Sequence, residues 1–180
     1  MTPLCRLLIV MLCLGNPALI LVARADQIGL SPPDSRVGLR TYGLGILPLD
    51  GNFTRFHGWM SYQSSNPSLC QVILEIEAGS LAMGSDSISE RIRGPDFMDT
   101  AQFPVVAFHG GCAGDTVSGN LTLHGQTHPF TLDLERSARG IVATGRLRRA
   151  EWGITAHPLL GGSTIRIRVE LPNPFPGSRT

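Results

Sequence analysis

The sequence predicts an all-β fold, an eight-stranded antiparallel barrel with a short helical insert near residues 85–93. Three observations support this. The segment 103–135 contains three short runs in which apolar and polar residues alternate, separated by residues typical of tight turns. The run at 163–171 alternates most regularly of all, with isoleucine and valine on one side and charged residues on the other. Strands with one apolar face must bury it, and a short antiparallel meander does so by closing on itself, which also removes exposed strand edges.

Residues 1–25 have the pattern of a secretory signal peptide. A basic residue precedes the apolar run 7–14, and Ala23 and Ala25 supply the small residues before a cleavage site. We expect cleavage after Ala25 and a periplasmic mature protein. An uncleaved anchor is the weaker alternative, because Pro17 breaks the apolar stretch, whose length is near the lower limit for a bilayer span.

The rest of the chain fits one domain. Residues 26–35 are expected to form a loose arm, 36–171 the barrel domain and 172–180 a proline-rich tail. A formal net charge of +1 gives no reason to expect a nucleic acid or an anionic membrane as a partner. All fifteen basic side chains are arginine, which by itself reflects genome composition; a cluster of them would be needed to claim recognition of an anion.

The strands are predicted from runs bounded by turn residues. The first is glycine-rich and therefore bent or bulged. Gly51 and Asn52 mark a turn before the second run, in which Phe53, Phe56 and Trp59 share one face only if a bulge lies near Gly58. The predicted strands are 36–46, 53–62, 69–78, 103–109, 116–123, 129–136, 140–149 and 163–171.

The strands 116–123 and 129–136 are predicted to form a hairpin. Gly125 and Gln126 suit a two-residue type II′ loop, because glycine takes a positive φ at its first position. This loop sets Leu121 opposite Phe130, so that the apolar residues of both strands share one face.

The insert between residues 79 and 102 does not alternate. Ser85 or Asp86 is expected to cap a short helix, which the following Gly-Pro pair ends. Phe97 and Met98 then lie on a loop and must be covered. They either plug the barrel end or touch a ligand, and a plug is the commoner outcome.

Cys70 and Cys112 are expected to form a disulfide. The other two cysteines leave with the leader, and the mature chain enters an oxidising compartment. If the runs 69–78 and 103–109 pair antiparallel, placing Cys70 opposite Cys112 aligns Leu74 with Phe108 and brings the apolar residues onto one face. A redox-active role is not expected, because no C-x-x-C motif is present.

No motif for catalysis, phosphate binding or dinucleotide binding is present, and no cofactor is expected. The five histidines lack the spacing of a zinc site, so no metal is expected. An enzyme acting on a lipid is the minority interpretation. Its candidate residues at a cavity mouth are Arg149, Glu151, His128 and His157.

Three segments resemble the YceI-like family of secreted bacterial proteins: DFMDTAQFPVVAF, SGNLTLHGQTHPFTLDL and RRAEWGI. The resemblance covers roughly residues 36–171. It implies a lipocalin-like antiparallel barrel that holds an isoprenoid or similar amphiphilic lipid inside. Family members usually have Arg-Ser-Asp-Phe-Gly where this chain has RAEWG, and the cysteine pair is not part of the family pattern.

The expected partner is therefore an isoprenoid or quinone-like lipid in a dry cavity, and a homodimer is left open. Each buried CH₂ contributes about 0.8 kcal/mol, so a long tail needs no polar contact to bind. The alternative is an interaction or structural barrel whose core the same side chains fill, without a ligand. The predicted lining residues are Phe53, Phe56, Trp59, Val72, Leu74, Ile76, Val106, Phe108, Leu121, Phe130, Leu132, Trp152, Ile154 and Ile167.

Overall fold

The structure is a computed structural model that describes residues 25–43, 46–63, 66–155 and 162–172. The expected signal peptide therefore lies outside the described residues except for Ala25, and so does the tail beyond Pro172. Within the described ranges, no helix is long and apolar enough to cross a membrane.

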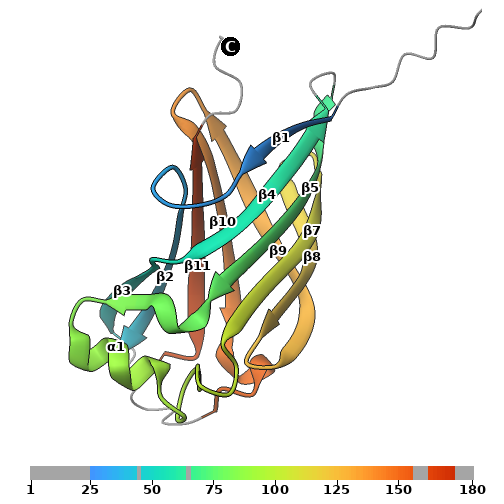
Figure 1. Ribbon diagram of the computed structural model, residues 1–180. Helices are drawn as coiled ribbons and strands as arrows, with labels where there is room; N and C mark the ends of the chain where they lie inside the picture. Colours follow the sequence, from blue (N-terminus) through green and yellow to red (C-terminus); the bar gives the residue numbers. More distant parts are fainter. Residues whose placement is uncertain (1–24, 44–45, 64–65, 156–161, 173–180) are drawn as a thin grey trace, which may run out of the picture.

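One curled antiparallel sheet makes up most of the described chain (Figure 1). It contains the eleven strands that the described residues form. Their bounds are β1 (Ala25–Gly29), β2 (Arg36–Gly43), β3 (Leu47–Phe53), β4 (Phe56–Gln63), β5 (Asn66–Glu77), β6 (Leu81–Met83), β7 (Val105–Ala113), β8 (Thr116–Leu123), β9 (Gln126–Ser137), β10 (Gly140–Arg148) and β11 (Thr164–Pro172). Two short 3₁₀ turns, η1 (Ala78–Ser80) and η2 (Arg149–Trp152), and one helix, α1 (Asp86–Arg93), complete the elements.

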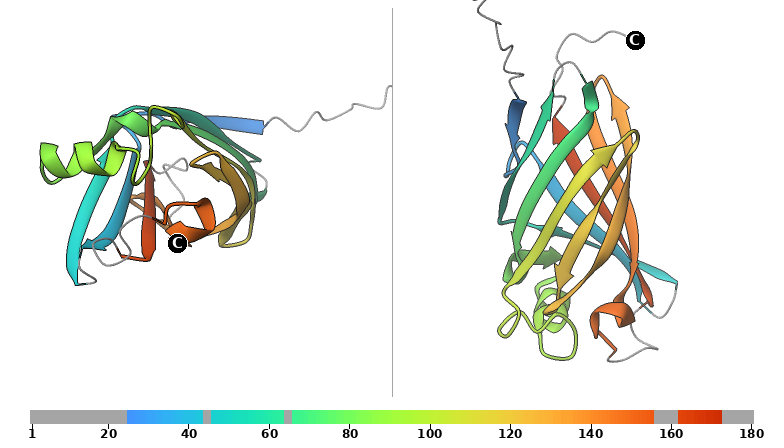
Figure 2. Two further views of the ribbon diagram at one scale, coloured as in Figure 1. Left: turned by 90° about the horizontal axis from the view of Figure 1, so that it is seen from below. Right: turned by 90° about the vertical axis from the view of Figure 1, so that its right-hand side faces the viewer.

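The strand order is β1-β4-β5-β7-β8-β9-β10-β11-β2-β3-β6. Strand β6 follows β5 in the chain through η1, yet it pairs with β3 at the other end of the strand order. The chain thereby links the two ends of the sheet. Figure 2 shows the result as a half-barrel with tilted strands, α1 beside one wall and η2 at the lower end. The prediction of an all-β antiparallel barrel is confirmed, whereas the count of eight strands is not.

The additional strand β3 lies where a turn was expected. Gly51 pairs with Leu39 of β2 on one side and with Met83 of β6 on the other. A Cβ atom on Gly51 would collide with the Met83 sulfur and lie 3.1 Å from Leu81 Cδ1. Glycine is thus required here because two strands approach closely, and the expected turn was wrong for that reason.

A strand also replaces part of the expected loose arm. Strand β1 pairs with β4, with Asp26 opposite Tyr62. The backbone N–H of Leu30 then donates to the Gly58 carbonyl at 2.9 Å, and the Leu30 side chain is buried. Nothing in the local sequence of this segment signals a strand; it is one because β4 offers it an otherwise unpaired edge.

The hairpin between β8 and β9 forms with a different loop from the predicted one. Leu123 pairs with Gln126, so the loop is His124-Gly125, with φ of 51° and 71°. Positive φ at both positions is typical of a type I′ turn, whose twist matches that of the strands. The register moves by two residues and places Leu121 opposite His128. Because the shift is even, the apolar residues still share one face.

Helix α1 confirms the predicted insert. Its first turn is capped by Ser85, whose Oγ accepts the Ile88 N–H at 3.3 Å, and Gly94 ends it. Ser89 is buried; its Oγ accepts the Met83 N–H at 2.8 Å and donates to the Ser85 carbonyl. These bonds attach α1 to β6, at the lower end of the barrel in Figure 1.

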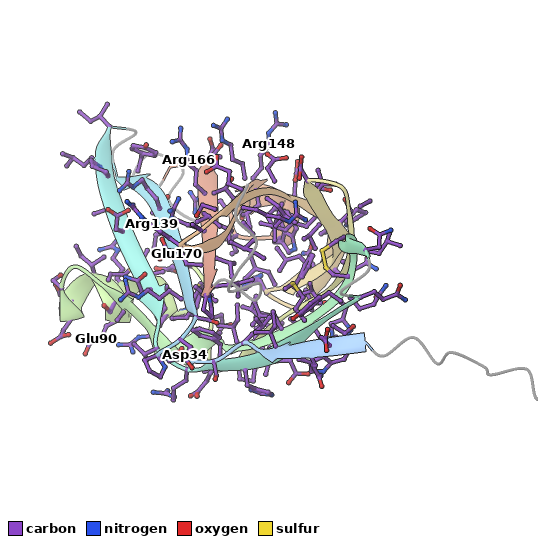
Figure 3. All side chains as sticks on the ribbon, turned by 90° about the horizontal axis from the view of Figure 1, so that it is seen from above. Asp34, Glu90, Arg139, Arg148, Arg166 and Glu170 are labelled. Carbon is purple, nitrogen blue, oxygen red and sulfur yellow. A yellow bond between two sulfur atoms is a disulfide. The ribbon has the colours of Figure 1, made fainter. Side chains whose placement is uncertain are left out.

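Charged side chains lie on the outer face. Arg148 and Arg166 point away from the barrel in Figure 3. Arg40 binds Asp50 through Nε–Oδ1 at 2.5 Å and Nη2–Oδ2 at 2.9 Å, and this hydrogen-bonded pair holds the pKa of the Asp50 carboxyl below its usual value. Because both side chains are exposed, the pair contributes little to stability.

The Cys70–Cys112 disulfide is present, and the β5–β7 register is the predicted one, with Leu74 opposite Phe108 and Ile76 opposite Val106. The bond joins residues 42 apart. It therefore closes a long loop and lowers the conformational entropy of the unfolded chain. On this loop-entropy account it stabilises the fold by about 3–4 kcal/mol.

We expect the double variant Cys70→Ala/Cys112→Ala to lose about 3–4 kcal/mol of unfolding free energy, because its unfolded chain gains the entropy that the cross-link removes. Urea denaturation followed by circular dichroism measures this. The wild-type protein in a reducing agent is the control and should unfold at nearly the same urea concentration as the variant. A variant as stable as the oxidised wild type would contradict the expectation.

Candidate binding cavity

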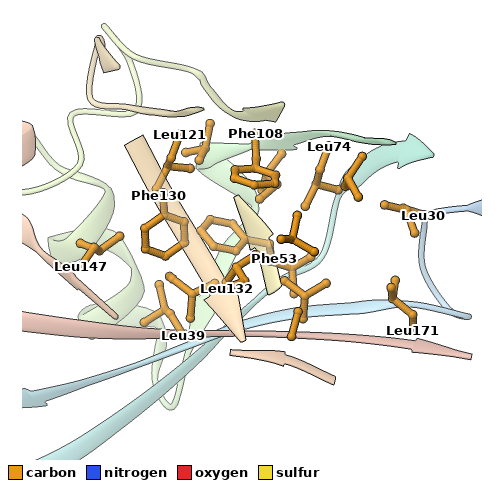
Figure 4. A pocket seen from close by; sticks show the side chains of 18 of the residues that line it. Leu30, Leu39, Phe53, Leu74, Phe108, Leu121, Phe130, Leu132, Leu147 and Leu171 are labelled. Carbon is orange, nitrogen blue, oxygen red and sulfur yellow. The ribbon is translucent and has the colours of Figure 1, made fainter. Parts of the chain in front are cut away.

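The interior of the half-barrel contains a narrow, almost wholly apolar cavity of about 120 Å³. Figure 4 shows many of the side chains that line it, which point toward one another from several strands. Leu30 and Leu171 lie at one end and Leu147 at the other. Because inward positions recur with a period of two along each strand, the lining forms a continuous apolar surface from one end to the other.

Two phenylalanines form the middle of the cavity wall. Phe108 and Phe130 meet edge to face, with ring centroids 6.5 Å apart. Glycines on neighbouring positions make room for the rings: a Cβ atom on Gly110 would lie 2.7 Å from Phe108 Cζ, and one on Gly145 would lie 2.7 Å from Phe130 Cζ. The width of the cavity is therefore set by large side chains packed over glycines.

Trp152, the last residue of η2, closes one end of the barrel, which we call the Trp152 end. Its side chain is 2% exposed and lies edge to face with Phe130 at 6.4 Å and with His128 at 5.1 Å. The indole N–H donates to the Leu121 carbonyl at 3.4 Å. His124 Nδ1 lies 3.1 Å from the Trp152 carbonyl, which joins the β8–β9 turn to η2.

The opposite end, which we call the Leu171 end, has the one charged side chain among the described residues that line the cavity. This is Arg136, whose Nη1 binds Asp115 Oδ1 at 2.6 Å and whose Nη2 donates to the Gly114 carbonyl at 2.9 Å. The guanidinium is therefore held at the rim by the β7–β8 turn, and the interior stays uncharged.

Eleven of the fourteen predicted residues line this cavity: Phe53, Val72, Leu74, Ile76, Val106, Phe108, Leu121, Phe130, Leu132, Ile154 and Ile167. Their placement on the cavity wall is a structural observation, and their contact with a ligand stays a prediction.

The other three predicted residues lie elsewhere. Trp59 is on the outer face, opposite Ile73 and Gly29, because β4 has no bulge near Gly58; its register shifts at Tyr62 instead. Phe56 is buried in the core without lining the cavity, and Trp152 packs beneath Phe130. The assumed bulge moved Trp59 to the wrong face, since each one-residue step in a strand reverses the side-chain direction.

Most lining residues that the sequence analysis missed follow the same alternation. Ile165 and Val169 share the face of Ile167, and Met60 shares that of Phe56 in an unbulged strand. Strict parity would therefore have identified them. Leu30 and Met98 come from a connecting segment and a loop, where no periodic signal exists. Phe97 and Met98 are both buried, as expected of a plug.

The polar candidates do not lie along the cavity lining. Arg149 is 5% exposed, and its guanidinium carbon lies 5.7 Å from the centre of the Phe97 ring. Glu151 is exposed. His128 is half-buried on the inward-facing side of β9, where it packs against Trp152 beyond the cavity lining, and its Nε2 lies 3.3 Å from Gln126 Oε1. His157 lies outside the described residues. Across the described ranges, no three His, Cys, Asp or Glu side chains are grouped as a metal site needs.

The family model of the YceI-like domain matches residues 29–172. The Protein YceI of Salmonella arizonae is 28% identical over 149 residues, which cover 74% of this chain and 78% of that protein. A UPF0312 protein of Vibrio cholerae is 27% identical over 134 residues, covering 66% of this chain and 71% of that one.

Two solved structures share the fold at low identity. The Burkholderia cenocepacia protein BcnA has a TM-score of 0.63 and 16% identity, over 76% of this chain and 94% of that one. A polyisoprenoid-binding domain from Saccharophagus degradans, described as implicated in plant cell wall breakdown, has a TM-score of 0.59 and 17% identity, over 82% of this chain and 97% of that one.

We expect Trp152→Ala to lower the unfolding free energy by about 3–5 kcal/mol, because it removes a fully buried ring and leaves a cavity at the Trp152 end. Trp59→Ala is the matched control and should cost less, since Trp59 lies half-buried on the outer face. Urea denaturation of both variants measures the difference. A larger loss for Trp59→Ala would refute the assignment of Trp152 as the closing residue.

Proposed function

Because the chain belongs to the YceI-like family, we propose that it binds an isoprenoid or similar amphiphilic lipid in the barrel interior. In this proposal the protein is a periplasmic carrier or store and not an enzyme. The observation that supports it best is the apolar cavity, whose one charged lining residue in the described chain is tied to a turn at the rim. A polar substrate would find few hydrogen-bonding partners among the described residues that line this interior.

The energetics favour a long hydrocarbon tail. At about 0.8 kcal/mol for each buried CH₂, a tail of about fifteen carbons contributes about 12 kcal/mol before the costs of association. Specificity then depends on the shape of the channel and on whatever receives the head group. The description of the Saccharophagus degradans domain as polyisoprenoid-binding agrees with this class of ligand. A quinone-like lipid fits the same tail requirement.

The cavity is too small to hold a long hydrocarbon tail unless it opens. Its volume of about 120 Å³ is comparable to the cavity of about 150 Å³ that holds a single benzene. A longer tail therefore needs side chains such as Val72, Ile165 and Ile167, which are half-buried, to move aside. The same small volume supports the second candidate, a filled-core barrel that binds a partner through its surface. Direct detection of a ligand distinguishes the two.

Secretion to the periplasm is supported by two features. The first 25 residues have the pattern of a cleaved leader. The Cys70–Cys112 disulfide is typical of proteins in an oxidising compartment.

We expect native mass spectrometry of the protein purified from an envelope fraction to show a stoichiometric adduct that is released on denaturation. The apolar interior would retain a tail through purification, since release exposes the tail to water. Organic extraction and mass analysis identify the adduct. A mass equal to the disulfide-bonded chain alone, even after incubation with polyprenyl alcohols and quinones, would favour the filled-core candidate.

We expect Val72→Trp to reduce the affinity for tritiated geranylgeraniol at least ten-fold. Val72 points into the cavity opposite Gly110, so a larger ring occupies the path of the tail. Equilibrium dialysis measures the affinity. Gln71→Trp on the exposed outer face of the same strand is the control and should bind as the wild type does. Equal affinities for both variants would place the ligand outside the barrel.

A further inference from the structure

A second hollow of about 450 Å³ lies beside the barrel cavity, between α1, the loop after it and strands β2, β3 and β11. We call it the side pocket; its own walls include Thr41, Leu49, Ser87, Arg91, Phe97 and Arg149. It shares four apolar side chains with the barrel cavity: Leu39, Met98, Ile154 and Ile165. One layer of side chains therefore separates the two hollows.

The charges in the side pocket have one sign. Among the described residues that line it, the two charged ones, Arg91 and Arg149, are both arginine. The remaining lining is apolar apart from two hydroxyl groups and one glycine. The described lining of the barrel cavity has its one charged side chain at the rim, so the side pocket is the place beside it where described cationic side chains can meet an ionic group.

Arg149 is positioned by η2 and the loop after α1. The residue is 5% exposed, and its guanidinium lies over the Phe97 ring. Burial lowers the pKa of this guanidinium because desolvation disfavours its charge, but an arginine remains protonated at neutral pH. A charge in such poorly hydrated surroundings interacts more strongly with an incoming anion than a charge in water does.

Arg91 provides the second cation from the last turn of α1. Its side chain is exposed, and in the described part of the chain it forms no ion pair. Arg93, two residues later, is engaged differently, since it donates to the Ser89 carbonyl at 3.2 Å and to the Gly79 carbonyl at 3.1 Å. Arg91 therefore faces the side pocket from a helix that Arg93 and Ser89 hold in place.

We propose that the side pocket binds the oxyanion head group of an amphiphile, a phosphate ester or carboxylate, while its hydrocarbon tail enters the barrel cavity. This inference rests on the proposed lipid-binding function and specifies the chemical class of the ligand. Arginine suits the role because its planar fork of N–H donors matches two oxygens of a phosphate or carboxylate.

The shared wall gives the tail a route. Met98 and Ile154 lie between the head group at the two arginines and the apolar channel. Methionine is unbranched and flexible, so it changes rotamer at low cost. An amphiphile bound in this way has its charged end beside α1 and its tail extending from the Trp152 end toward Leu171.

The test compares two probes with the same fifteen-carbon tail, farnesyl monophosphate and farnesol, by equilibrium dialysis. We expect the wild type to bind the phosphate roughly ten-fold more tightly than the alcohol, as for one charge-assisted contact. In Arg91→Gln this preference should fall several-fold, while the affinity for farnesol stays unchanged. Arg139→Gln, on the β9–β10 turn at the other end of the barrel, removes the same charge and should keep the preference.

The outcomes separate the two proposals. Failure of both probes to bind the wild type would overturn lipid binding itself. Equal binding of both probes, unaffected by Arg91→Gln, would overturn the head-group inference and leave lipid binding intact. An equal loss of preference in Arg139→Gln would attribute it to net charge and also overturn the inference. Inorganic phosphate should compete only weakly; competition as strong as that of farnesyl monophosphate would show a site for free anions instead.

Discussion

The register between β5 and β7 is the constraint on which the interior depends. Leu74 faces Phe108 across this pair, and the Cys70–Cys112 bond ties the same two strands. A slip of one residue would turn every inward side chain of one strand outward, because side chains alternate along a strand. Strands β4 and β8 pair with β5 and β7 in turn, so the orientation of the neighbouring strands follows from this contact.

The curled sheet defines an interior that is apolar and narrow. Large rings such as Phe108 and Phe130 lie over glycines, and Trp152 closes one end. Close packing of this kind contributes to stability but leaves little space for a ligand. Binding of a lipid, as proposed, therefore requires that contacts between these side chains be exchanged for contacts with the ligand.

Charge is distributed so that the interior and its side pocket differ. The outer face has exposed ion pairs such as Arg40–Asp50, and the rim has Arg136 with Asp115. Arg149 instead lies buried beneath the surface next to an apolar channel. This separation of a cationic pocket from a dry channel matches the two ends of an amphiphile, a polar head and a hydrocarbon tail.

The alternation of residues by itself determined the antiparallel class, most strands, the inward face and the cysteine pairing, because these depend on a period of two that is local in sequence. The capping pattern at Ser85 likewise determined α1. Only the tertiary structure decided that Gly51 lies within a strand, that Trp59 faces outward, and that Arg91 and Arg149 line one pocket. These features depend on which distant segments pair and pack together, and sequence periodicity contains no information about such partners.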